Sequence, residues 1–356
     1  MAIAEDSPRA GGNGAPRAAP RGANTGRATP LKRLLKVYME RPELVALVVL
    51  VVLIGYFTLR SGGLFLSYQN LRGILGLFPE LSIMALGFGL LMIAGEFDLS
   101  IGSVFGLAPI VLCALAQHTG LPFWACFAAA IVMCVGVGFL NGAISLSFGI
   151  PSFITTLGML FMLRSLCVVI YQSGAAPTLP ASAPTWAFTD PIVFFRVSTL
   201  WLLALAVLIY VLLERTNFGN WVRATGGALE SAKAMGIPTN AVKIACFVIS
   251  SVCAGLAGII QVVRIASPLP SLGDGVELQA IAAAVIGGIA LSGGVGNVLG
   301  AIVGMAIIRV IDSGMVMSRV DANWFKFAVG LLTIVAVIAN IWLGRRARAL
   351  KVEKGA

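Results

Sequence analysis

Charged residues are scarce in this sequence, and several patterns typical of enzymes are missing. Only 11% of the 356 residues are charged and 58% are apolar, whereas a soluble domain has about 25% charged and about 45–50% apolar residues. There is no GxxxxGK[ST] phosphate-binding loop, and His118 is the single histidine. The six cysteines lie in apolar runs without CxxC spacing. We therefore predict a membrane protein with buried structural cysteines, no ATP site of the phosphate-loop kind, no metal, no cofactor and no enzymatic activity.

Long apolar runs predict an all-α, polytopic transmembrane helical bundle of about ten spans. A spanning helix needs about 20 apolar residues at a rise of 1.5 Å each. The candidate spans are 44–60, 77–94, 100–117, 122–147, 152–172, 197–213, 239–263, 277–292, 296–314 and 324–343. The run 277–292 is short and is followed by the tight turn Ser292-Gly293-Gly294, so a re-entrant or tilted helix is the alternative to a full span there.

The basic residues predict the orientation of these spans. Seventeen of the 25 Lys and Arg residues lie before the first span, after the last, or around the connection between the sixth and seventh. With ten spans these segments share one side, which is the cytoplasm by the positive-inside rule. We therefore expect an inner-membrane protein with both termini in the cytoplasm. The net charge of +10 is explained by this topology, so no nucleic-acid partner is predicted.

The two ends of the chain differ from its centre in composition. Residues 1–42 are rich in Gly, Ala, Pro and Arg, which predicts a disordered basic cytoplasmic tail. The transmembrane domain then covers 43–344, and a second basic cytoplasmic tail covers 345–356. On the opposite side, the proline-rich stretch 172–196 is unsuited to a long regular helix and is either a docking surface or a linker.

The first candidate site is the motif GEFDLSIGS between the second and third spans. Ionisable groups this close to hydrocarbon are functional candidates, and here they are Glu96 and Asp98, with Ser100 beside them. Asp98 or Ser100 as a cap of the third span is the alternative to a direct role in transport. Acid–base chemistry by the two carboxylates is not expected, because no nucleophile, histidine or metal ligand accompanies them.

The second candidate site combines Asn141 with the motif FGIPSFITTLG at residues 148–158. Pro151 favours the start of a helix here. Ser152, Thr155 and Thr156 then lie in its first turns. These hydroxyls either face a substrate path or bond to carbonyls of their own helix.

The third candidate is the polar stretch 217–242. Ala228–Met235 favours a short helix that is too polar to span, with Gly236 and Pro238 ending it. Such a helix suits docking to a cytoplasmic partner, and a helix on lipid headgroups is the alternative. In a fourth stretch, 271–304, the seven glycines from position 287 onward permit close helix approach and a tight turn.

These four segments, in this order, resemble the permease family of sugar ABC importers of the ribose, xylose and galactose type. The matching motifs are FDLSIGS, NG followed by IPSFITTLG, ATGGALESAKAMGI, and ELQAIAAAVIGGIALSGG. The resemblance covers about residues 45–345. Two departures are the Glu96-Phe97 pair, where Gly-Ile is common, and Ala-Leu-Glu-Ser in the loop helix, where paired acidic residues are common.

The resemblance implies an importer subunit that works with a cytoplasmic ABC ATPase, a periplasmic sugar-binding protein and a second permease copy, as a homodimer in the lipid bilayer. The short helix would then be the coupling helix that contacts the ATPase, with Ala228, Glu230, Ser231, Lys233, Met235 and Gly236 as candidates. The substrate-path candidates are Glu96, Asp98, Ser100, Asn141, Ser152, Thr155 and Thr156.

The expected cargo is a monosaccharide or small polyol moved by alternating access. Small and hydroxyl-bearing helices suit an uncharged solute better than an ion, and the span-interior arginines are Arg164 and Arg309. A branched-chain amino acid, a nucleoside or a signalling furanoside is the alternative cargo. An ion-driven secondary transporter would need an inverted repeat and buried coupling carboxylates; no repeat is evident, and Glu80 is the main carboxylate inside a span.

Overall fold

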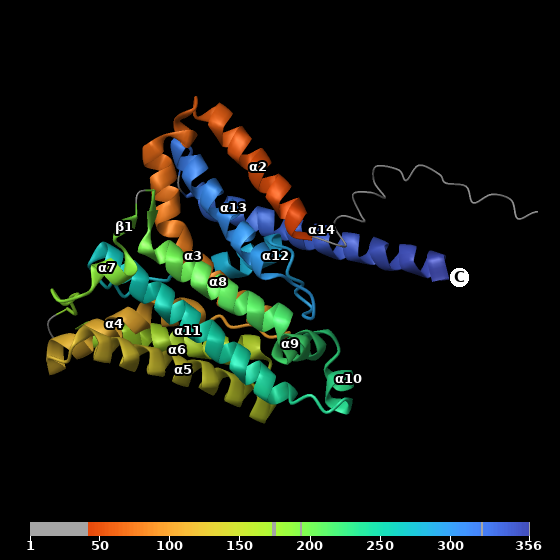
Figure 1. Ribbon diagram of the computed structural model, residues 1–356, viewed down its shortest axis with the longest axis horizontal. Coiled ribbons are helices and arrows are strands. Elements are labelled where there is room, and N and C mark those ends of the chain that lie inside the picture. The colour runs from red at the N-terminus through yellow and green to blue at the C-terminus, as the bar shows by residue number, and fades with distance from the viewer. Residues whose placement is uncertain (1–41, 173–175, 193, 322, 356) are drawn as a thin grey trace, which may run out of the picture.

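The part of the protein that the structure describes is almost entirely helical, as predicted. The computed structural model describes residues 42–355 except 173–175, 193 and 322 (Figure 1). Its helices are α2 (Pro42–Arg60), η1 (Leu64–Leu66), α3 (Tyr68–Ile93), α4 (Ile101–Thr119), α5 (Phe123–Phe148), α6 (Ser152–Gln172), α7 (Thr185–Phe188), α8 (Val197–Arg215), α9 (Asn217–Gly227), α10 (Leu229–Ala234), α11 (Thr239–Ile265), α12 (Val276–Ile286), α13 (Val298–Met317) and α14 (Trp324–Gly355). The two-residue strands β1 (Pro191–Ile192) and β2 (Phe195–Arg196) pair antiparallel.

Among the described residues, seven helices are long and apolar enough to cross a membrane: α3, α4, α5, α6, α8, α11 and α13. Three shorter apolar helices, at Leu44–Arg60, Val276–Ile286 and Trp324–Ala339, account for the other predicted spans. The short run at 277–292 is therefore not a full span, because eleven residues reach only about 16 Å.

One predicted boundary needs correction. α3 begins at Tyr68, nine residues before the predicted start of that span, because Ser67 caps a more polar first turn by accepting from the Asn70 N–H. The backbone of α14 continues to Gly355, so the basic segment 345–356 is helical up to that residue. The predicted N-terminal tail lies outside the described residues except for Pro42.

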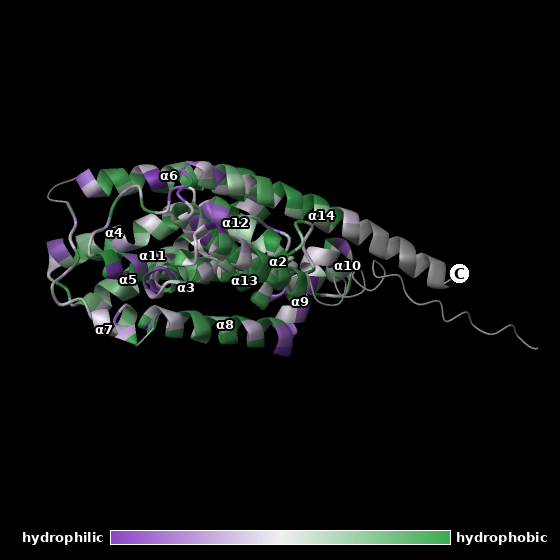
Figure 2. Ribbon diagram, turned by 90° about the horizontal axis from the view of Figure 1, so that it is seen from above, coloured by the Kyte–Doolittle hydropathy of each residue, from purple (hydrophilic) through white to green (hydrophobic). Residues whose placement is uncertain are grey.

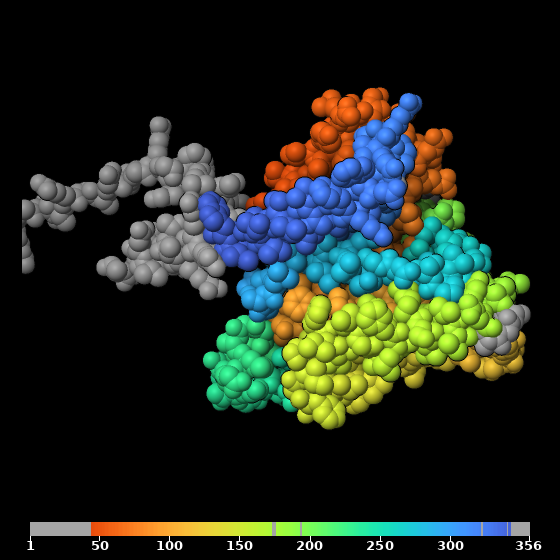
Figure 3. Space-filling view, turned by 180° about the vertical axis from the view of Figure 1, so that it is seen from behind, coloured from red at the N-terminus to blue at the C-terminus, as the bar shows by residue number. Residues whose placement is uncertain are grey.

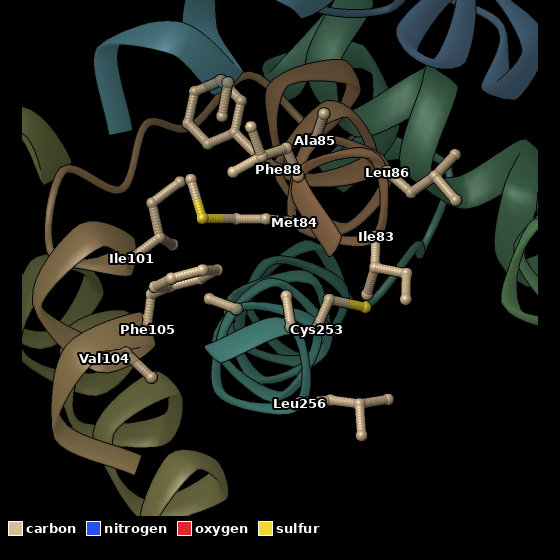
Figure 4. Packing of buried hydrophobic residues seen from close by; sticks show 14 of the residues in the cluster. Ile83, Met84, Ala85, Leu86, Phe88, Ile101, Val104, Phe105, Cys253 and Leu256 are labelled. Atoms are coloured by element: carbon tan, nitrogen blue, oxygen red, sulfur yellow. The ribbon is translucent and has the colours of Figure 1, made fainter. Parts of the chain in front are cut away.

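α11 lies at the centre of the bundle and packs against α3, α4 and α5. Figure 4 shows Met84 of α3 and Phe105 of α4 beside Cys253 of α11 in this core. Glycines allow the helices to approach closely. A β-carbon on Gly258 of α11 would overlap the carbonyl oxygen of Phe105. All six cysteines are free and buried, as predicted.

The molecule has two distinct ends. Figures 1 and 2 place α7 at one end of the bundle, and α9 and α10 at the other. We refer to them as the α7 end and the α10 end. The predicted interruption of helix in 172–196 is confirmed: after Gln172, the last residue of α6, only the single turn of α7 and the β1–β2 pair are regular among the described residues. At this end Phe188 is buried and stacks on Trp201, with ring centroids 5.9 Å apart.

Candidate functional site

The connection between α3 and α4 is an irregular segment built around one buried carboxylate. Gly95 adopts a positive φ of 85° directly after α3, and α4 begins only at Ile101. Asp98 is fully buried. Its Oδ1 accepts from the Ser100 N–H at 2.8 Å and from the Ser100 hydroxyl at 2.6 Å. The carboxylate therefore closes the turn that leads into α4, in the way an Asp side chain stabilises a turn.

Asn141 of α5 holds the same segment from the side. Its Nδ2 donates to Asp98 Oδ2 at 3.2 Å and to Ser100 Oγ at 2.8 Å. Asp98 lies in a connection outside the spanning helices, where burial raises its pKa to about 6 and the hydrogen bonds from Ser100 and Asn141 oppose that rise. These donors favour the charged form. The carboxylate is thus supported by donors from the segment itself and from α5.

The first turns of α6 supply the remaining contacts. The Phe97 N–H donates to Ser152 Oγ at 3.2 Å, and the Leu99 N–H donates to Thr156 Oγ1 at 3.1 Å. Thr156 also donates to the Ser152 carbonyl oxygen at 2.7 Å, so the alternative of bonding within its own helix applies as well. Together α5 and α6 satisfy backbone groups that a buried irregular segment leaves unpaired.

Five of the seven substrate-path candidates therefore meet in one buried cluster: Asp98, Ser100, Asn141, Ser152 and Thr156. We call these five residues the loop clamp. Glu96 and Thr155 are not part of it. Glu96 forms an ion pair with Lys243 of α11, and the buried Thr155 Oγ1 has no hydrogen-bond partner among the described residues. Contact of the loop clamp with a solute stays a prediction.

The polar stretch between α8 and α11 forms two helices, where one was predicted. The short helix α10 matches the predicted segment, and Gly226 and Gly227 end the preceding helix α9. Ala232 packs inward with no exposed surface, whereas Met235 is 70% exposed. Glu230 and Lys233 form an ion pair of 3.0 Å on the surface. α10 therefore presents charged and apolar groups outward at the α10 end of the molecule.

Three glycine-containing segments meet where α9 ends. A β-carbon on Gly226 would overlap the carbonyl oxygen of Ile93, the last residue of α3, and would lie 2.7 Å from the Gly294 nitrogen. The Gly294 N–H donates to that same oxygen at 2.8 Å. A β-carbon on Gly293 would lie 2.8 Å from the Gly95 Cα. We call this contact between the ends of α3 and α9 and the α12–α13 connection the glycine junction. It joins the α9–α10 pair directly to the segment that the loop clamp holds.

Sequence reasoning missed the partners of the buried charges. Glu80, with no exposed surface, accepts two hydrogen bonds from Arg264, at 2.8 and 3.1 Å. Arg309 pairs with Asp312 at 2.8 Å, and Arg164 pairs with Asp274 at 2.8 Å. Only the pair at positions 309 and 312 has a local signal, since residues three apart face each other on a helix.

The helices and their interior define a class of protein. A bundle of membrane-crossing helices defines an integral membrane protein, and its exposed helix pair at one end suits a permease, an integral membrane transport subunit. Comparison with known proteins agrees. The chain belongs to the family described as branched-chain amino acid transport system / permease component, whose model matches residues 70–337.

Three similar proteins are each named autoinducer 2 import system permease protein LsrC. The protein from Photorhabdus luminescens is 32% identical over 312 residues, covering 86% of this chain and 91% of that protein. The protein from Yersinia enterocolitica is 34% identical over 277 residues, covering 76% of each, and the one from Yersinia pestis strain Pestoides F is 32% identical over 306 residues, covering 86% of each. No solved structure matches the chain.

The family confirms the predicted class. The chain is a multi-pass inner-membrane permease component of an ABC importer and not an enzyme. Membership of this class implies that the chain works with an ATPase and a periplasmic binding protein.

Proposed function

We propose that this permease imports a small, uncharged, hydroxylated solute, driven by an ATPase that contacts α10. The observation that carries the proposal is the glycine junction. There the end of α9, which leads into α10, is in direct backbone contact with the end of α3 and with the α12–α13 connection. Movement imposed on α10 must therefore displace these segments, since packed backbones cannot slide past one another without a shift of the whole element.

The proposed orientation places the α10 end in the cytoplasm. The α10 end of the molecule carries three basic residues, Arg215, Arg223 and Lys233. Lys and Arg in loops favour the cytoplasmic side of the membrane. Both termini are then cytoplasmic, and the α7 end faces the binding protein. A second permease subunit completes the translocation path, and we favour a second copy of this chain.

The proposed cargo is a monosaccharide or small polyol. Autoinducer 2 is the second candidate, because it is the cargo in the name of the relatives. Both are compatible with an interior in which hydroxyl, amide and carboxylate groups are available for hydrogen bonds.

The proposal is tested with the chain reconstituted in liposomes together with its ATPase and its binding protein. We expect uptake that needs ATP and all three components, and the ligand of the binding protein, found by thermal-shift screening, should be the transported solute. Accumulation of sugar by the chain without an ATPase would overturn the proposal.

Contact at α10 is tested separately by cross-linking. A cysteine at exposed Met235 should cross-link to the ATPase subunit. A cysteine at Val207, which is 61% exposed at the middle of α8, serves as the control and should not cross-link. Equal cross-linking at both positions, or none at Met235, would remove α10 as the contact.

A further inference from the structure

The chain between α11 and α12 runs irregularly beside the first two turns of α4 and alongside α6. α11 ends at Ile265 and α12 begins at Val276. A β-carbon on Gly106 of α4 would overlap the Leu272 carbonyl oxygen, and one on Gly102 would lie 2.8 Å from the Gly273 carbonyl oxygen. Two glycines of α4 thus leave room for this backbone. The segment lies beside α4 and not beyond the end of the bundle.

Arg164 fixes the depth of this segment. It is the thirteenth of the 21 residues of α6, which places it roughly 18 Å along that helix. Its Nη1 donates to the carbonyl oxygens of Pro270 and Leu272 at 3.1 and 3.0 Å, and its Nη2 pairs with Asp274 at 2.8 Å. The hydrogen bonds of Arg164 hold residues 270–274 near mid-membrane depth, so α12 is a half-helix that starts inside the membrane.

Two carboxylates at this depth have unused acceptor capacity. The Asp274 side chain is 60% exposed despite its pairing with Arg164. Glu277, in the first turn of α12, is 8% exposed, and its Oε2 has no hydrogen-bond partner among the described residues. Gly102 makes room for this oxygen, since a β-carbon there would overlap it.

These features are incompatible with contact to lipid. Irregular backbone and charged groups occur at membrane depth only where they are buried in protein or line a water-filled cavity. The view from behind shows this segment in cyan between the yellow-green surface of α6 and the blue surface of α14 (Figure 3). α8, whose outer face is apolar, lies on the opposite side of the bundle from α6 and α14 (Figure 2).

We propose that residues 270–277, held by Arg164, form a hydrophilic solute site facing the second permease subunit, where Asp274 and Glu277 accept hydrogen bonds from the hydroxyl groups of an uncharged polyol. The inference rests on the proposed function and adds the location of the solute. Carboxylates accept bonds only, so hydroxyl donors match them. The one cation of this group, Arg164, is already bonded to Asp274 and two carbonyls, which disfavours an anionic solute. Half-helices that begin near the midplane mark substrate sites in other transporters.

The first test asks whether water reaches the segment. In the full chain, reconstituted in liposomes with its ATPase, a cysteine replaces the exposed Ser271, and the modification rate with a charged, water-soluble thiol reagent is measured. The unmodified chain, whose cysteines are buried, gives the background, and Val207→Cys on α8 is the lipid-facing control. We expect at least tenfold faster modification at position 271 than at 207. Equal rates would overturn the site.

The second test asks what the site binds. D-ribose, D-xylose and D-galactose are added to the Ser271→Cys protein, with leucine and sodium ions as comparisons. At least one sugar should slow modification several-fold, and leucine and sodium should not. Adding Asp274→Asn or Glu277→Gln should abolish the protection, measured against the unprotected rate of each double variant. Protection by leucine or sodium alone, or sugar protection that survives both substitutions, would contradict the proposal.

Transport separates this inference from the proposed function. Asp274→Asn and Glu277→Gln should lower ATP-driven sugar uptake at least tenfold, whereas Asp190→Asn, a matched change near the α7 end, should not. If the unmodified complex imports no sugar, the proposed cargo fails. If it imports sugar and the two variants import equally well, the solute site alone fails.

Discussion

Gly226 offers a sharp test of the glycine junction, because its neighbour provides a matched control. Alanine at position 226 would place a methyl group against the carbonyl oxygen of Ile93, 2.7 Å from the Gly294 nitrogen and 3.0 Å from the Ala94 carbonyl carbon. All three neighbours are backbone atoms, so no side-chain rotation relieves the overlap. At Gly227 the nearest atom, the Gly294 Cα, would be 3.6 Å away, which is ordinary van der Waals contact.

The two substitutions should change the free energy of unfolding in opposite directions. Replacing a helical glycine by alanine favours folding by about 0.5–1 kcal/mol, and this gain applies at both positions. Overpacking costs about 1–3 kcal/mol and applies only at Gly226. Gly226→Ala should therefore be destabilising by up to about 2.5 kcal/mol, whereas Gly227→Ala should be neutral or slightly stabilising.

The assay is the melting temperature of the purified variants in one detergent, followed by ATP-driven uptake in liposomes. Gly226→Ala should melt below the unmodified chain and transport more slowly, because the junction between α9 and α3 must open to admit the methyl group. Gly227→Ala should match or exceed the unmodified chain in melting temperature. If Gly226→Ala melts no lower and transports equally fast, the close approach of these three backbones is wrong.

Three further changes probe the buried polar contacts. Asn141→Leu removes the donor to the Asp98 carboxylate and should lower the free energy of unfolding by about 1–3 kcal/mol, measured as a lower melting temperature. An unchanged melting temperature would show that the loop clamp does not stabilise the fold. Arg264→Gln leaves Glu80 buried without its charged partner and should cost about 3–5 kcal/mol, with less folded protein recovered, and adding Glu80→Gln should restore recovery. Glu96→Lys places two cations together and should reduce stability, whereas combining it with Lys243→Glu should recover it; failure of the exchange would show that the pair is not specific.

Local chemistry made much of the fold predictable. Apolar runs of about 20 residues located the spans, and Pro151 correctly marked the start of α6, which begins at Ser152. The helix stop at Gly236 and Pro238 located α10 for the same reason, since both residues act on the chain beside them. The five residues of the loop clamp could be selected from the sequence because they are polar groups next to apolar runs, and the structure shows that they are neighbours.

The rest depended on partners far apart in the chain. Residues 266–275 contain Pro, Gly, Ser and Asp and look like an extramembrane loop, yet Arg164, more than a hundred residues away, holds them beside α4. The contact between Gly226 and Ile93 could not be predicted from the neighbouring sequence either, because glycine is common at the C-terminal ends of helices that make no such contact. Depth in the membrane is set by such tertiary contacts, and hydropathy does not report it.

The Glu80–Arg264 pair has a consequence for how the chain enters the membrane. The two residues are 184 positions apart, so α3 is synthesised well before the helix that carries its partner. At about 5–20 residues per second, the interval is roughly 10–35 s. Throughout it Glu80 has no Arg264 to pair with, and a carboxylate in hydrocarbon costs about 2.5–3.5 kcal/mol at a helix centre. The apolar residues of α3 must therefore offset that cost on their own until α11 emerges, so that the insertion of α3 and its final pairing within the bundle are separate events.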